Sequence, residues 1–80
     1  MNLYIIRTNY MNSGIFGIYS SLLRAQQAFN HFLKTNIDIT KAVYHDDYSW
    51  QFTTKNDEEF GAEIIHDILD YEFVEGVITE

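Results

Sequence analysis

The apolar positions at the start of the chain fall into two short runs separated by turn residues. Residues 2–10 begin with a cluster of β-forming side chains, and residues 15–19 form a second apolar run. The intervening residues 11–14 include Asn, Ser and Gly, which favour turns. This pattern predicts two antiparallel strands joined as a β-hairpin.

A longer amphipathic segment follows the hairpin. From Leu22 to Leu33, apolar residues recur at the three- and four-residue spacing of an α-helix. Ser20 or Ser21 precedes them, and a serine at this place can accept a hydrogen bond from a free backbone amide at the helix N-terminus. The segment is therefore predicted to be a serine-capped helix that ends at Asn36.

The strand pattern then returns. Apolar and β-branched residues predict strands at 39–44 and 48–54, with a polar turn at 45–47 between them. In the second of these strands aromatic and polar residues alternate, which places the aromatic residues on one face of the sheet. A second hairpin is therefore expected, with its aromatic face toward the core.

The remaining residues predict a second helix and a last strand. Between Asp57 and Asp70 apolar residues recur on one side of a helix, and acidic residues lie near its N-terminal end, where the helix dipole favours them. Gly61 weakens that helix by about 1 kcal/mol relative to alanine. Residues 71–80 have strand-forming character, with Gly76 as a candidate bulge.

The predicted order of elements is β-β-α-β-β-α-β. Two hairpin–helix units of this kind form an α+β fold, with a mostly antiparallel sheet and two helices on one face. Eighty residues without proline or a low-complexity stretch are expected to form a single domain, residues 1–80. An apolar fraction of 46%, with six Tyr, six Phe and one Trp, distinguishes the chain from a disordered acidic protein.

Charge is distributed unevenly along the chain. Residues 1–37 contain three basic residues and no Asp or Glu, a charge of +3, whereas residues 38–80 contain twelve acidic and two basic residues, a charge of −10. The two segments sum to the net charge of −7. A surface with one dominant sign of charge should repel nucleic acid and anionic membranes and attract basic surfaces, including those that normally hold nucleic acid.

The acidic residues are regularly spaced within the predicted second helix. Four of them recur at steps of four, four and three: Glu59, Glu63, Asp67 and Asp70. On a helix this spacing lines them along one side, about 5–6 Å apart, which is comparable with every second phosphate of a nucleic-acid strand. Such a row could imitate a nucleic-acid backbone, with Asp46 and Asp47 of the preceding turn as flanking charges. Simple solvation of an acidic helix face explains the same pattern.

Catalytic and metal-binding patterns are weak. Adjacent acids such as Asp46–Asp47 and Glu58–Glu59 point in different directions, and no serine lies in a nucleophile motif. His66 with Asp70, and His45 beside the turn acids, are candidate metal-ligand groups, but neither has a standard spacing. The chain is therefore expected not to be an enzyme and to bind no cofactor or metal.

The chain is small, contains no cysteine, has a compact sheet-and-helix pattern and carries an acid-rich segment from Asp38 to Glu80. In these features it resembles small acidic phage-encoded proteins that act against host defences. Anti-CRISPR proteins and DNA-mimic inhibitors of restriction enzymes are examples. Their sequences and folds are diverse, so the resemblance implies a mode of action and no particular target. The stretch Gly14-Ile-Phe-Gly-Ile-Tyr-Ser-Ser21 with the following helix also resembles short domains of phage and bacterial origin.

The preferred hypothesis is an inhibitory binding protein that occupies the basic nucleic-acid groove of a host defence complex. It would act in the cytoplasm, without contacting nucleic acid or a membrane directly, and its contact residues would be the six acids named above. The alternative is a structural or regulatory interaction protein that forms a homodimer. Such a dimer would form through an uncovered sheet face, or through contact between the basic half of one copy and the acidic half of another.

Overall fold

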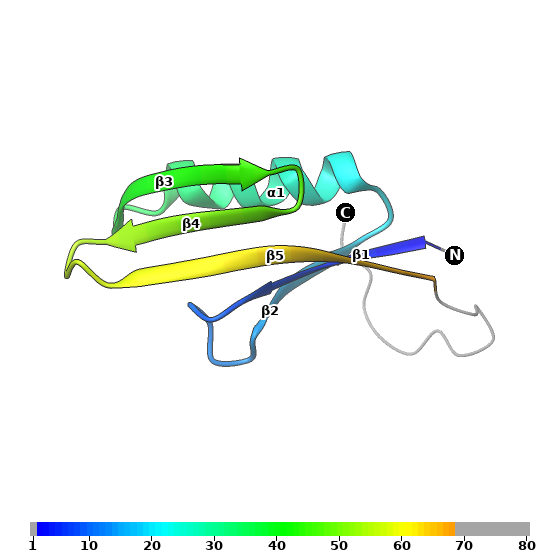
Figure 1. Cartoon of the computed structure of the whole chain (residues 1–80), viewed down its shortest axis with the longest axis horizontal. Coiled ribbons are helices and arrows are strands. Elements are labelled where there is room, and N and C mark those ends of the chain that lie inside the picture. Colours follow the sequence, from blue (N-terminus) through cyan, green and yellow to red (C-terminus); the bar gives the residue numbers. More distant parts are fainter. Residues whose placement is uncertain (1, 69–80) are drawn as a thin grey trace.

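The computed structural model describes residues 2–68, which form five strands and one helix. All strand pairs are antiparallel, and the order across the sheet is β2-β1-β5-β4-β3. The helix lies against one face of this sheet (Figure 1). In chain order the elements are β1 (Asn2–Thr8), β2 (Ile15–Tyr19), α1 (Leu22–Thr35), β3 (Ile39–Asp46), β4 (Ser49–Thr54) and β5 (Glu59–Ile68).

The long strand β5 connects two hairpins. Its second part, residues 62–68, pairs with β1, and its first part, residues 59–63, pairs with β4. The β1–β2 and β3–β4 hairpins are therefore staggered along β5 (Figure 1). Among the registered pairs, only residues 62–63 have partners on both sides.

Helix α1 begins directly after the residue that caps it. Ser21 has an extended backbone, and its side-chain oxygen accepts a hydrogen bond of 3.1 Å from the backbone N–H of Arg24. At the other end the N–H of Asn36 donates to the carbonyl of Phe32. The predicted serine-capped helix is thus confirmed, with Ser21 as the cap. With 14 residues, this single described helix is not long and apolar enough to cross a membrane.

The core lies between α1 and the sheet and is largely aromatic. Phe29 of α1 is fully buried, and its ring centroid lies 4.6 Å from that of Trp50 and 5.9 Å from that of Phe52. Ile6 and Ile64 are direct partners across β1 and β5 and complete this layer. The predicted aromatic face of β4 is confirmed for Trp50 and Phe52, which are each only 2% exposed. Tyr48, which the pattern placed on the same face, precedes the strand and is 46% exposed.

The predicted second helix is wrong, because residues 59–68 form β5. Phe60, Ala62 and Ile64 face α1 at a two-residue period, which is the period of a strand. This segment supplies hydrogen-bonding partners to both β4 and β1, and a helix here would leave the two hairpins without a common neighbour. The described order is therefore β-β-α-β-β-β, with one helix. The predicted last strand, residues 71–80, lies outside the described residues.

Candidate functional site

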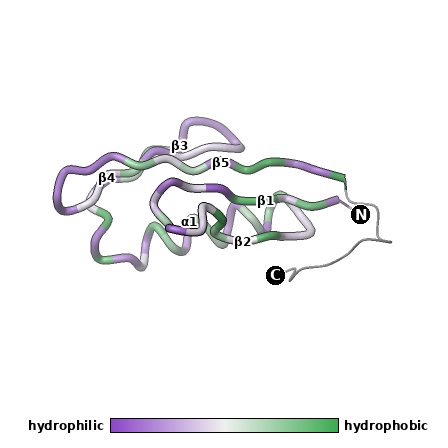
Figure 2. The backbone as a smooth tube through the Cα atoms, turned by 90° about the horizontal axis from the view of Figure 1, so that it is seen from below, coloured by the Kyte–Doolittle hydropathy of each residue, from purple (hydrophilic) through white to green (hydrophobic). Residues whose placement is uncertain are grey.

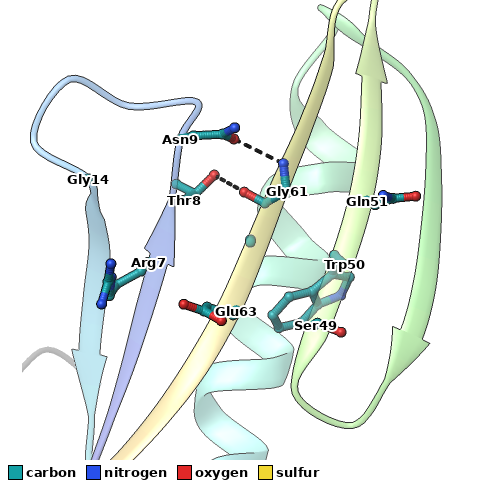
Figure 3. Close-up of a pocket in the computed structure, with 10 residues that line it drawn as sticks. Arg7, Thr8, Asn9, Gly14, Ser49, Trp50, Gln51, Gly61 and Glu63 are labelled. Carbon is teal, nitrogen blue, oxygen red and sulfur yellow. Dashed lines mark hydrogen bonds between the residues drawn. The ribbon is translucent and has the colours of Figure 1, made fainter.

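The sheet face that points away from α1 is the candidate binding surface. We call it the open face, because α1 packs on the opposite face of the sheet, behind the strands in Figure 3. Side chains alternate along a strand, so the open face carries the residues between the core-facing positions of β5. From one end of β5 to the other, these are Glu59, Gly61, Glu63, Ile65 and Asp67.

Three of the predicted contact residues share this face. Glu59, Glu63 and Asp67 are all exposed and occupy every fourth position of β5. Four residues of a strand span about 13 Å, whereas neighbouring positions on one side of a helix are about 5–6 Å apart. The row therefore exists, but the spacing predicted from a helix is wrong and does not match alternate phosphates. The fourth residue, Asp70, lies outside the described residues.

The two predicted flanking acids lie in and beside the β3–β4 turn. Oδ1 of Asp46 accepts hydrogen bonds from Oγ of Ser49 at 3.1 Å and from the backbone N–H of Tyr48 at 2.7 Å. The backbone oxygen of Asp47 accepts a 2.8 Å hydrogen bond from Nε2 of Gln26, which ties the turn to α1. Ser49 is the cross-strand partner of Asp46 and of Glu63. Asp46 thus lies two strands, about 10 Å, from Glu63.

Basic residues also occur on the open face. Arg7 is the direct cross-strand partner of Glu63 (Figure 3), and Lys41 lies in a cross-strand row with Thr53 and Glu59. Within residues 2–68, no acid lies within the 4.0 Å ion-pair distance of Arg7 or Lys41. The open face therefore carries charges of both signs whose side chains are available to a partner.

The uneven charge of the sequence persists across the sheet. All eight acidic residues of the described range lie in the segment 38–67, which forms β3, β4 and β5, together with two lysines. These three strands are neighbours, so one side of the sheet has eight acids against two lysines, a formal charge of −6. We call it the acidic side, and Figure 2 shows its most hydrophilic part at the β4–β5 turn. Within residues 2–68, one ion pair involves these acids, between Lys55 Nζ and Asp38 Oδ1 at 3.9 Å.

A shallow groove with a volume of about 570 Å³ crosses the open face where the two hairpins overlap on β5. Gly61 lies at its centre and has no side chain to fill it (Figure 3). Arg7 and Asn9 line the groove on the β1 side, and Ser49 and Gln51 line it on the β4 side. Polar side chains thus line the groove on both sides, and Trp50 and Ala62 also contribute to its lining.

Hydrogen bonds hold the backbone of Gly61 in place. Oγ1 of Thr8 donates to the Gly61 carbonyl at 2.7 Å, and the Gly61 N–H donates to Oδ1 of Asn9 at 2.9 Å. A Cβ atom at Gly61 would meet the carbonyl oxygen of Trp50 at 3.6 Å, an ordinary contact, so glycine is not required by lack of space. Glycine weakens a strand and is typical of places where a ligand or another backbone approaches closely. In the sequence, Gly61 was interpreted as a residue that weakens the predicted second helix, and this interpretation gave no sign of a groove.

His66, which the sequence placed in a candidate metal-ligand group, takes part in the packing of β1 against β5. Its ring stacks on that of Tyr4, with centroids 4.7 Å apart and an angle of 6° between the planes. Its Nε2 atom lies 3.1 Å from Oδ1 of Asn2. Among residues 2–68, no three His, Cys, Asp or Glu side chains are grouped so that they could hold a metal ion.

Comparison of the chain with protein-family models, with curated proteins and with solved structures finds no match. The acidic side, the open face and the groove are the features of the described residues that bear on function.

Proposed function

We propose that this chain is a binding protein that docks through its open face and acidic side on a basic surface of another protein. The observation that carries the proposal is the acidic side itself. All eight of its carboxylate residues are exposed, and Asp38 alone among them has an ion-pair partner within residues 2–68. Such a surface attracts cationic partners and accelerates their encounter.

The residues proposed to contact the partner are Glu59, Glu63 and Asp67, with Asp46 at the side. Their separation of about 13 Å along β5 suits basic side chains that are spread over a protein surface. This separation supports electrostatic docking on such a surface more than imitation of the consecutive phosphates of a nucleic-acid strand. Where the partner's basic surface normally holds nucleic acid, docking would exclude that ligand. We therefore propose that the chain inhibits a nucleic-acid-binding host defence complex.

The test compares the chain with two variants of equal net charge. Glu59→Gln/Glu63→Gln/Asp67→Asn, the open-face variant, removes three negative charges from the proposed contact surface. The control, the helix variant, adds three positive charges on the exposed side of α1 through Leu23→Lys/Gln27→Lys/His31→Lys. Both changes bring the net charge from −7 to −4.

Each immobilised protein is exposed to a bacterial host lysate, and retained proteins are eluted with salt and identified by mass spectrometry. We expect the unmodified chain and the helix variant to retain the same basic nucleic-acid-binding protein, and the open-face variant to lose it. Equal losses by the two variants would show that net charge alone governs retention. Unchanged retention by the open-face variant would exclude the proposed contact residues.

A further inference from the structure

The outer edge of β3 is exposed along almost its whole length. β3 is the last strand of the described sheet, and every residue from Thr40 to Asp46 is exposed. An edge strand offers unpaired backbone N–H and C=O groups to another strand, and proteins commonly protect such edges with charges, proline or bulges. The stretch 42–44 has neither charge nor proline, and the two bulges of β3 lie to either side of it.

We propose that β3 pairs with β3 of a second copy of this chain, in antiparallel orientation, to form a two-fold symmetric dimer with a continuous sheet. At the opposite edge of the described sheet, β2 is a poorer template, because it has five residues against the eight of β3. This pairing and the proposed partner docking share Asp46, whereas none of the three open-face acids of β5 lies on the β3 edge. The open-face variant therefore leaves every residue of the proposed pairing unchanged.

Symmetry and the faces of β3 define a register. A two-fold axis normal to the sheet keeps both copies of α1 on the same face and pairs residues that share a face. With the axis at Val43, Ala42 of each copy lies opposite Tyr44 of the other. Lys41 then lies opposite the end of the other strand that carries His45 and Asp46.

Side-chain size is complementary in this register. Tyr44 is on the α1 side of the sheet, where its ring stacks on Trp50 with centroids 5.4 Å apart, and it is 45% exposed. Ala42 is small and exposed on the same side. The ring of Tyr44 would therefore cover Ala42 of the second copy, and the two Val43 side chains, each 43% exposed, would meet at the axis.

Charge is complementary as well. Within residues 2–68, Lys41 has no acid at ion-pair distance. Asp46 accepts hydrogen bonds from its own turn and has no basic partner in the same range. Both lie on the open-face side of β3, because their cross-strand partners Thr53 and Ser49 do. The two-fold axis would bring each Lys41 near the Asp46 of the other copy, which gives two such contacts in one dimer.

Sedimentation velocity over a wide range of protein concentration tests the dimer. We expect a species with twice the 9.4 kDa mass of the chain. Val43→Lys should abolish it, because two ammonium groups would meet at the axis, whereas the β-branched Val43→Thr should retain it. Circular dichroism of both variants checks that the monomer remains folded, as expected for a half-exposed position.

Disulfide formation tests the register, because the chain contains no cysteine. Val43→Cys should form a cross-linked dimer under mild oxidation much faster than Lys55→Cys, which lies away from the edge. A chain that stays monomeric at every concentration, a dimer that Val43→Lys does not disturb, or equal cross-linking of the two cysteine variants would each overturn the proposal. A monomer that instead captures an unrelated extended peptide along β3 would overturn it too.

Discussion

Nε1 of Trp50 donates a hydrogen bond to Oδ1 of Asn30 over 2.9 Å, which joins the core of β4 to α1. Trp50 is only 2% exposed, so water cannot readily replace this acceptor. Asn30→Ala should therefore lower the free energy of unfolding by about 1–3 kcal/mol, the cost of a buried donor without a partner.

Urea unfolding followed by the fluorescence of Trp50, the single tryptophan, measures this change. Gln27→Ala on the exposed side of the same helix is the control, and it should alter the free energy of unfolding by less than about 0.5 kcal/mol. Similar values for the two variants would show that the Asn30–Trp50 hydrogen bond contributes little.

The helix cap gives a second prediction. Ser21→Ala removes the side-chain acceptor of the Arg24 N–H and should destabilise the protein by about 1 kcal/mol. Ser20→Ala changes the neighbouring exposed serine and should have little effect. Thermal unfolding of the two variants distinguishes them, and a larger loss for Ser20→Ala would mean that the cap is misassigned.

Local patterns predict much of this fold. The β1–β2 hairpin, α1 and the β3–β4 hairpin each depend on residues close together in sequence, and their periods agree with the structure. The local pattern of residues 59–68, in contrast, does not agree with the structure. Ile64, Ile65 and Ile68 fit one side of a helix, and the segment becomes a strand because β1 and β4 both pair with it. Such long-range pairing has no local pattern.

The candidate site was predictable in part for a geometric reason. Residues four apart lie on the same side of a helix and also on the same face of a strand, so Glu59, Glu63 and Asp67 share a face in either structure. Their distance does depend on the element, which is why the predicted spacing was wrong. The groove at Gly61 depends on the overlap of two hairpins, and only the tertiary structure shows it.

Substitution by alanine should have different effects on the free energy of unfolding at Gly61 and at Gly17. Gly61→Ala has room for its Cβ and should leave the free energy of unfolding unchanged or raise it by up to about 1 kcal/mol. A Cβ at Gly17 would lie 2.6 Å from Oη of Tyr19, a ring that is only 8% exposed. Gly17→Ala should therefore destabilise the protein by about 1–3 kcal/mol.

Chemical unfolding of both glycine variants measures these changes. A marked loss of stability in Gly61→Ala would contradict the view that the fold does not require this glycine. If the fold tolerates Gly61→Ala but partner binding weakens, the groove is part of the contact surface.

Alkaline pH should reveal the environment of Tyr44. Partial burial raises the pKa of its hydroxyl above the ordinary value of 10.0, the charges of Asp47 and Asp46 raise it further, and a hydrogen bond with Gln26 opposes them. Because the folded-state pKa is the higher one, the contribution of Tyr44 to stability is complete below about pH 10 and is lost as pH rises through the folded-state pKa.

Tyr44→Phe removes this ionisation, so its stability should fall less steeply above about pH 10 than that of the unmodified chain. Urea unfolding at a series of alkaline pH values measures the difference. Parallel pH profiles for the two proteins would contradict the raised pKa.

The most direct test of the central claim is the affinity for the captured basic partner as a function of salt concentration. Electrostatic docking through the open face predicts that binding to the unmodified chain weakens steeply as salt rises. The open-face variant, Glu59→Gln/Glu63→Gln/Asp67→Asn, should bind more weakly and with a smaller salt dependence, while the helix variant of equal net charge should retain the steep dependence. Equal salt dependence for the unmodified chain and the open-face variant would contradict the account.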